Sequence, residues 1–310
     1  MKFAARFSFV LLVFPFFIFG GIENYLKKAE DKSGNHKMKN VDFIYMINLD
    51  QRPERWESSN RQLNPYGIFP YRFSAVNGWE LSLEAINDVG LKFKKGMVGG
   101  YLGTTYRLED AFERYHSIIE NEGQVYFCHG MARGTIGILL SHLSVLRDAL
   151  DSHYKTIWVM EDDIEVLSDP RQISDLIEKL DQLVGKEKWD VLFTDRNIRG
   201  RNGEEIPARG MASRPNFNPK DTSQYYIAKQ ESSDFIRLGA RFGATSMILR
   251  RSGMKKIYEF IVAHSLFHPY DMDFYLPSGI KMYTVDKNVV SNITRGSSDN
   301  GAPNYLQPFQ

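Results

Sequence analysis

The chain has 310 residues, 43% of them hydrophobic, which is enough for one large globular domain or two small ones. Lys and Arg number 39 and Asp and Glu 38, so the bulk charge gives no field that favours nucleic acid, and we expect no nucleic-acid partner. The single cysteine, Cys128, excludes an intramolecular disulfide and a cysteine-rich zinc site.

An apolar run opens the chain at residues 7–22, which carry no charge. Its length falls between the roughly 7–15 residues of a signal-peptide core and the roughly 17–25 of a membrane span. We expect residues 1–25 to be a signal-anchor or a signal peptide, and the lack of a clear cleavage site favours the anchor. Residues 26–40 are polar and Lys-rich and predict a tether. The prediction is a membrane-associated chain with a single N-terminal anchor, and basic residues on both flanks leave the side of the membrane open.

A folded domain is expected from residue 41 to residue 310. Residues 41–49, VDFIYMINL, are apolar with β-branched and aromatic members and predict a buried strand. Pro53 suits the first turn of a following helix. Arg52 and Arg55 lie at this point, and their forked guanidinium groups suit a phosphate, although a solvated helix face is the commoner use of such residues. A second strand is expected within residues 71–78, closed by an Asn-Gly turn.

The rest of the domain alternates between strand and helix patterns. Leu139, Leu143, Leu146 and Leu150 recur at helical spacing and predict an amphipathic helix from residue 134. Further segments follow: strands at 155–160, 189–195 and 244–249, helices at 173–183 and from 252, and a long polar loop at 196–229. This alternation predicts an α/β fold with much parallel pairing.

Three consecutive carboxylates, Glu161, Asp162 and Asp163, directly follow the apolar strand at 155–160. Ligands of open α/β sheets bind beyond the carboxyl ends of the strands, and carboxylates there suit a hard cation such as Mg²⁺ or Mn²⁺. Neighbouring side chains of an extended segment point to opposite faces, so we expect one aspartate to bind the ion and the other to hold a water or a ribose hydroxyl. A solvated strand end is the plain alternative.

Two other places carry candidate residues. His142 lies on the apolar side of its helix, which favours a core role over a catalytic base, and Ser141 lacks the surroundings of a nucleophile. Asp271 and Asp273 would share one face if their segment were extended, and one could then accept a proton from a hydroxyl group. An ordinary helix start is the alternative for this pair.

Several motifs occur in a fixed order: IYMINLDQRPERW, RFSAVNG, GTIGILLSH, VMEDDIEV, WDVLFTD, GATSMILRRSGMKKI and PYDMDF. In this order they resemble glycosyltransferase family 25, which includes bacterial lipooligosaccharide galactosyltransferases and collagen galactosyltransferases. The resemblance covers about residues 41–291. Thr135 and Ile138 stand where the family has Glu and Cys, and Asn77 stands where it has an acidic residue.

The resemblance implies a GT-A-like fold with a mostly parallel central sheet flanked by helices. It also implies inverting transfer of a hexose, galactose or glucose, from a UDP-sugar to a glycan or protein hydroxyl, with Mn²⁺ or Mg²⁺. The residue roles it implies are these: metal and diphosphate binding by Asp163, Asp162 and Glu161, a nucleotide pocket formed by Asn48, Arg52 and Arg55, a donor site shaped by Ser141 and His142, and a base at Asp271 with Asp273 beside it.

Two other functions compete with this one. A non-catalytic binding or adhesion protein on the same fold is one, because a fold does not guarantee chemistry and the family's Glu is missing at Thr135. A metal-dependent phosphohydrolase is the other, but it would need a second ligand cluster that the sequence does not show.

Overall fold

A computed structural model describes residues 21–97, 102–107, 114–294 and 298–306. Most of the apolar run that predicts an anchor, residues 7–20, lies outside the described residues. Among the residues that are described, the search for a helix long and apolar enough to span a bilayer finds none.

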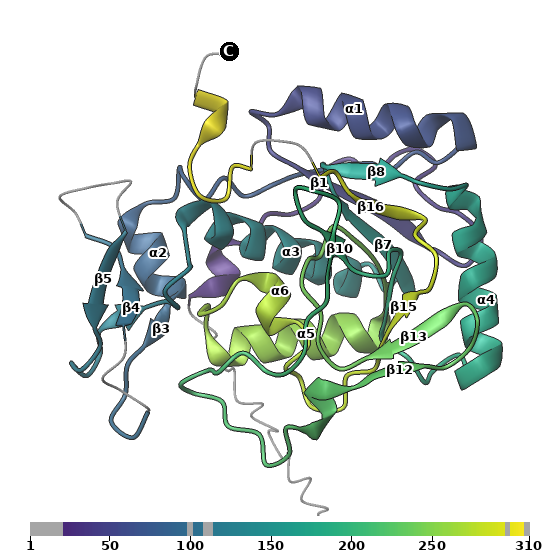
Figure 1. The fold of residues 1–310 in the computed structure, drawn as a ribbon. Helices are drawn as coiled ribbons and strands as arrows, with labels where there is room; N and C mark the ends of the chain where they lie inside the picture. The colour runs from purple at the N-terminus through teal and green to yellow at the C-terminus, as the bar shows by residue number, and fades with distance from the viewer. Residues whose placement is uncertain (1–20, 98–101, 108–113, 295–297, 307–310) are drawn as a thin grey trace, which may run out of the picture.

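An eight-stranded sheet forms the centre of the domain, in the order β12-β13-β15-β9-β14-β7-β1-β2 (Figure 1). Its strands are β1 Phe43–Asn48, β2 Tyr71–Ser74, β7 Thr156–Glu161, β9 Val191–Phe193, β12 Ala228–Gln230, β13 Phe235–Leu238, β14 Ser246–Arg250 and β15 Met282–Val285. All residues of β1 and β14 are buried. A strand covered on both faces needs a continuous apolar run instead of alternation, which is the pattern that the sequence carries.

The direction of the strands is mixed. β1 pairs in parallel with β2 and β7, and β9 with β15, whereas β14 is antiparallel to both β7 and β9, and β13 to both β12 and β15. Six strands therefore point one way, and only β13 and β14 oppose them. The predicted α/β class is confirmed, with the added finding that a reversed strand, β14, separates β7 from β9.

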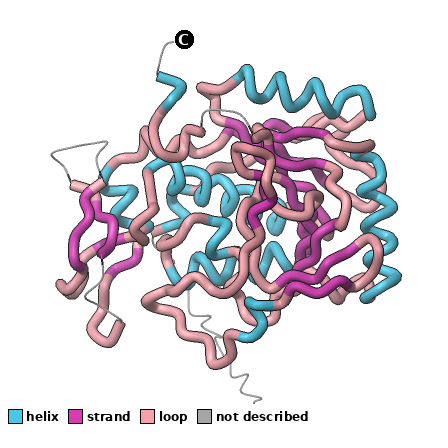
Figure 2. Tube along the Cα trace, in the orientation of Figure 1, coloured by secondary structure: helices cyan, strands magenta, loops and turns pink. Residues whose placement is uncertain are grey.

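Helices cover both faces of this sheet (Figures 1 and 2). Side chains of β1 that alternate along the strand enter two different cores: Tyr45 and Ile47 pack with α3 and α5, and Ile44 and Met46 pack with α4. The helices are α1 Pro53–Leu63, α2 Leu83–Val89, α3 Arg133–Asp151, α4 Ile173–Val184, α5 Arg251–His264 and α6 Tyr270–Asp273. The predicted helices from 134, at 173–183 and from 252 correspond to α3, α4 and α5.

Four small two-stranded sheets surround the centre. They pair β3 Leu91–Lys92 with β6 Val125–Tyr126, β4 Leu102–Thr105 with β5 Tyr115–Ile118, β8 Ile164–Val166 with β16 Val290–Asn292, and β10 Ile198–Arg199 with β11 Glu205–Ile206. The predicted polar loop at 196–229 contains β10, β11, one 3-10 turn and the first two residues of β12, and is otherwise irregular, with exposed and partly exposed residues and two buried ones, Arg214 and Tyr225 (Figure 2).

Candidate active site

The site begins where β1 and β7 end side by side. Ile47 pairs with Glu161 in the parallel register, so the next residues lie side by side: Asn48, the last residue of β1, and Asp162, the first residue after β7. The Asn48 side chain donates to Asp162 Oδ2 at 2.6 Å and accepts from Arg72 Nε at 2.7 Å. Asn48 is 1% exposed. Asn48 therefore orients Asp162 from inside the protein. It does not line the pocket, although the resemblance implied that it would form part of a nucleotide pocket.

Asp162 is fixed from three sides. Besides Asn48, Arg55 lies 3.4 Å from its Oδ1, and its main-chain carbonyl accepts from Ser59 Oγ at 2.7 Å. Burial raises the pKa of Asp162, while Arg55 and the Asn48 hydrogen bond act in the opposite direction. Both carboxylate oxygens of this residue already have protein partners.

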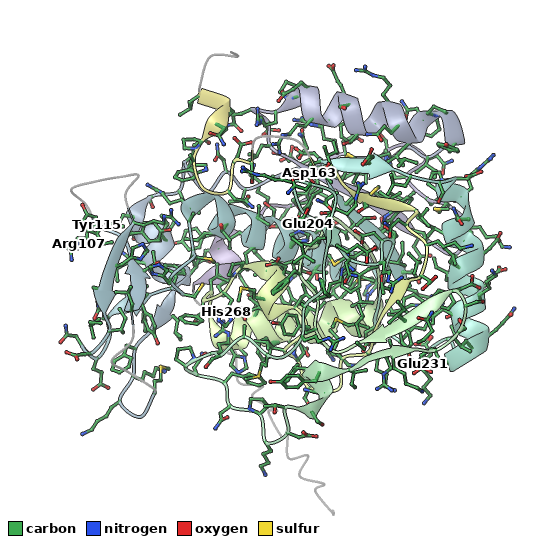
Figure 3. The ribbon with its side chains drawn as sticks, viewed as in Figure 1. Arg107, Tyr115, Asp163, Glu204, Glu231 and His268 are labelled. Carbon is green, nitrogen blue, oxygen red and sulfur yellow. The ribbon has the colours of Figure 1, made fainter. Side chains whose placement is uncertain are left out.

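Asp163 differs from its neighbour. Burial, with the negative charges of Glu161 and Asp162, raises the pKa of Asp163 to about 7. Its Oδ1 atom is enclosed and has no hydrogen-bond partner among the described residues. Burying a carboxylate oxygen without a partner is unfavourable for folding. The position next to this oxygen is therefore suited to a cation or to a hydrogen-bond donor of a ligand. Figure 3 shows Asp163 beside the start of β8.

Glu161 is held by α3. Its Oε1 lies 3.0 Å from His142 Nε2, and the His142 ring stacks on Tyr270 of α6 with centroids 4.1 Å apart and planes at 8°. His142 is buried, as its apolar helix face predicts, yet its ring reaches the acidic strand end. Ser141 Oγ donates to Gly137 O and accepts from the Val76 N–H at 2.8 Å. These two hydrogen bonds give Ser141 a structural role.

A pocket opens in front of these groups. The acidic strand end forms one side, and Arg55, Ser141 and His142 belong to the lining. Arg52 is buried behind this wall, where it pairs with Glu54 and Asp299. The lining also includes residues that sequence reasoning did not assign to a site: Asn77, Trp79, Ser298, Asp299 and Asn300.

The two aspartates of α6 have separate surroundings. The segment is helical, so the alternative of an ordinary helix start holds and the carboxylates do not share one face. Asp271 Oδ2 accepts from the Gly243 N–H at 2.9 Å. Burial raises the pKa of Asp271, and the negative charge of Glu161 raises it further. Asp271 therefore interacts electrostatically with the acidic strand end.

Asp273 is 0% exposed and pairs with Arg214 and with His268 at 3.0 Å. Burial opposes its ionisation, but Arg214 and His268 outweigh burial and hold the pKa of Asp273 below its usual value. His268 lies well away from Asp163 in Figure 3. A carboxylate so enclosed cannot reach a substrate, and this argues against the catalytic role that the resemblance implied for Asp273.

The described residues contain no group of three or more His, Cys, Asp or Glu side chains arranged to enclose a metal ion. The consecutive carboxylates 161–163 thus do not form an all-protein cage. Mg²⁺ and related cations often take only one or two carboxylates from the protein and complete their shell with substrate phosphates and water. The enclosed Oδ1 of Asp163 fits that kind of open site.

Comparison with known proteins gives a consistent family. The sequence profile of Glycosyltransferase family 25 (LPS biosynthesis protein) matches residues 41–274. A Glycosyltransferase 25 family member of Drosophila melanogaster is 30% identical over 56% of this chain and 24% of its own length. Procollagen galactosyltransferase 1-B of Xenopus laevis is 24% identical over 60% of this chain and 25% of its own length.

A human relative, Inactive glycosyltransferase 25 family member 3, is 26% identical over 50% of this chain and 22% of its own length. The matched part of the chain therefore corresponds to about a quarter of each of these relatives. The crystal structure of A197 from STIV aligns over 47% of this chain and 62% of its own, with 14% identity and a TM-score of 0.29, too low to bear on the fold.

Proposed function

Because this chain belongs to glycosyltransferase family 25, we propose that it is a metal-dependent inverting hexosyltransferase. It would move galactose or glucose from a UDP-sugar to a hydroxyl group of a glycan or protein. The observation that carries the proposal is one pocket that combines Arg55 with the carboxylates Glu161, Asp162 and Asp163 at the carboxyl ends of β1 and β7. The name of the Xenopus relative, a procollagen galactosyltransferase, supports the same chemistry.

Mn²⁺ or Mg²⁺ is the cofactor that we propose for this pocket. Asp163 is the first ligand we assign, because its Oδ1 lacks a partner among the described residues, whereas both oxygens of Asp162 are engaged by Asn48 and Arg55. Glu161 and Asp162 would complete the acidic side of the site. When bound, the cation would offset the negative charge that grows on the departing nucleoside diphosphate.

Arg55 is the residue we assign to the diphosphate. Its guanidinium lines the pocket and lies 3.4 Å from Asp162, so that carboxylate restrains it beside the proposed metal site. A forked cation can donate two parallel hydrogen bonds to one phosphate group. Because Arg55 is already oriented, the donor would lose little side-chain entropy on binding.

Asp271 is the proposed proton acceptor. In inverting transfer, the acceptor oxygen bonds to the anomeric carbon as the bond from that carbon to the diphosphate oxygen breaks, and the hydroxyl proton passes to a carboxylate. The raised pKa of Asp271 makes it a stronger base than an ordinary aspartate. His142, whose ring stacks on Tyr270 of α6, and Glu161 line the pocket and would help to orient the acceptor hydroxyl.

Donor turnover tests this proposal. The full chain in detergent is incubated with Mn²⁺ and a panel of UDP-sugars, and the release of UDP is measured. We expect release from one UDP-hexose, with loss on chelation and in Asp163→Ala, while Asp234→Ala, an exposed carboxylate paired with Lys179, keeps wild-type turnover.

A folded wild-type chain that neither binds nor turns over any UDP-sugar would contradict the enzyme and favour a non-catalytic binding protein. One observation favours a binding protein: the human and mouse relatives of this chain are both named inactive glycosyltransferase 25 family member 3.

Membrane attachment is a separate proposal. The uncharged run at residues 7–22 supports an N-terminal anchor, and the Lys-rich residues 26–40 support a tether. Fractionation of cells that express the full chain or a variant lacking residues 1–22 tests it. The full chain should sediment with membranes and the variant should not; recovery of both in the same fraction would contradict the anchor.

A further inference from the structure

We infer that the C-terminal segment, residues 298–306, is a wall of the donor pocket, and that Asp299 within it positions Arg55, which lines that pocket, and Arg52 behind it. The inference rests on the proposed function, because it assigns the segment a part in binding the donor. It concerns residues beyond the family match, which ends at residue 274.

Asp299 connects the segment to both arginines. Its Oδ2 accepts from Arg52 Nε at 2.7 Å and lies 3.9 Å from the Arg55 guanidinium. Its Oδ1 accepts from the Tyr305 N–H at 3.1 Å, which closes the segment into a compact turn. Asp299 is 6% exposed, so these are contacts of low solvent screening. Arg55 therefore stands between two carboxylates, Asp162 on the sheet side and Asp299 on the C-terminal side.

Two further hydrogen bonds hold the segment on the pocket, one to its main chain and one to the Tyr305 side chain. Trp79 Nε1 donates to the Asp299 carbonyl at 2.7 Å, and Asn77 Nδ2 donates to the Tyr305 hydroxyl at 2.9 Å. Gly134, at the start of α3, allows the close approach, because a Cβ there would lie 2.3 Å from the Asp299 carbonyl oxygen. Figure 1 shows this yellow segment passing beside the beginning of α3.

These contacts give the segment a functional position. Trp79, Asn77 and Gly134 line the same pocket as Arg55, and so do Ser298, Asp299 and Asn300. A donor in this pocket would lie between the acidic end of β7 and the C-terminal segment. Asp299 would act through Arg52 and Arg55 by fixing where their guanidinium groups point, so it is a positioning residue.

Steady-state kinetics of Asp299→Asn tests the inference. The variant keeps the size of the side chain but loses the charge that holds the arginines. We expect the KM for the UDP-sugar, and the Kd for UDP with Mn²⁺, to rise about tenfold, as for the loss of a charge-assisted hydrogen bond. The kcat at saturating donor should stay near wild type. Trp79→Phe, which loses the indole donor to the segment, should change KM in the same direction.

Two controls separate positioning from a merely structural role. Asp299→Glu restores the charge and should recover part of the donor affinity. Asp234→Asn removes an exposed, paired carboxylate elsewhere and should leave KM unchanged. Thermal unfolding of every variant shows whether a changed KM reflects loss of fold.

Three results would count against the inference or its premise. An unchanged KM in a folded Asp299→Asn chain would show that Asp299 does not contribute to donor binding. Tighter UDP binding in that variant would also overturn the inference, because Asp299 would then compete with the diphosphate for the arginines. Failure of the wild-type chain to bind any nucleotide would contradict the proposed function and, with it, a donor wall.

Discussion

Asp163, whose Oδ1 is enclosed, and Asp273, which is fully buried, have neighbours that give them opposite protonation behaviour. Burial, together with two neighbouring carboxylates, raises the pKa of Asp163 to about 7. Asp273 faces Arg214 and His268, and its pKa falls below the usual value. Repulsive surroundings are tolerated at sites that bind a cation or carry out chemistry, whereas matched surroundings are typical of structural ion pairs.

The raised pKa of Asp163 predicts a stabilising substitution. An acid whose pKa is higher in the folded state than its unfolded value of 3.8 destabilises the fold as pH rises through that interval and stays unfavourable above pH 7. A pKa difference of one unit is worth about 1.4 kcal/mol, so the penalty at pH 8 is at most about 4 kcal/mol and smaller where water reaches the side chain.

Asp163→Asn should therefore raise the free energy of unfolding of the metal-free chain at pH 8, with little effect at pH 4, and should abolish donor turnover. Urea denaturation at the two pH values measures the first effect, and Asp234→Asn serves as the matched control. A metal-free variant less stable than wild type at pH 8 would contradict the assignment.

Asp273→Asn should do the reverse. It removes the partner of a buried guanidinium, Arg214, which is 0% exposed as a side chain. Leaving one member of a buried pair uncompensated costs about 3–5 kcal/mol, so urea unfolding should shift by that amount. Asp271→Asn should not lower stability at pH 8, because burial raises the pKa of Asp271 and ionising it disfavours the fold, while kcat falls about 10²-fold or more. Equal stability losses in the two variants would remove the distinction between a structural and a catalytic aspartate.

At the scale of elements, α3 is the support of the pocket. Its His142 contacts Glu161, and its Ser141 accepts a hydrogen bond from the Val76 N–H, two residues after the end of β2. β2 ends at Ser74, within the segment 71–78 in which a strand and a closing Asn-Gly turn are predicted. The residues that leave the sheet become pocket lining.

Gly137 makes this packing possible. A Cβ at residue 137 would lie 2.5 Å from the Val76 carbonyl oxygen and 2.5 Å from the Gly78 nitrogen, both main-chain atoms. Gly137→Ala should cost about 1–3 kcal/mol through overpacking, which exceeds the gain in helix propensity of about 1 kcal/mol. It should also raise the KM for the donor. Gly130→Ala, with no atom within 4 Å of its Cβ, is the neutral control; equal unfolding curves for the two variants would refute the close contact.

Across the whole molecule, stability is expected to be uneven. The central sheet lies between two large cores, whereas β3 to β6 share a small cluster in which the buried side chains are Leu91, Phe93, Ile119, Tyr126 and Phe267. β5 alternates between partly exposed and exposed residues, and Leu102 and Ile118, paired across β4 and β5, are both exposed.

Amide hydrogen exchange should therefore be fastest, among the strands compared, in β4 and β5 and slowest in β1 and β7. Segments with few buried apolar contacts open locally, while core strands exchange only on global unfolding. Mass spectrometry of peptides from these strands measures the difference. Equal protection of β5 and β7 would show that the small sheets unfold only with the central one.

The sequence by itself determined the elements and the acidic strand end. Short, mainly apolar runs predict β1, β7 and β14, helical spacing predicts α3, and the motif order identifies the family, because these signals depend on residues near one another in the chain. The carboxylates at 161–163, predicted to follow a strand, also lie at the carboxyl end of that strand, which is where ligands of open sheets bind.

Only the tertiary structure decided the rest. The reversal of β14, the burial of Asn48 and Arg52 behind the pocket, and the separation of Asp271 from Asp273 depend on which elements pack together. Asp299 meets Arg52 from 247 residues away. Local periodicity carries no information on such a contact, because its partners are brought together only when the sheet, α3 and the C-terminal segment have closed on one another.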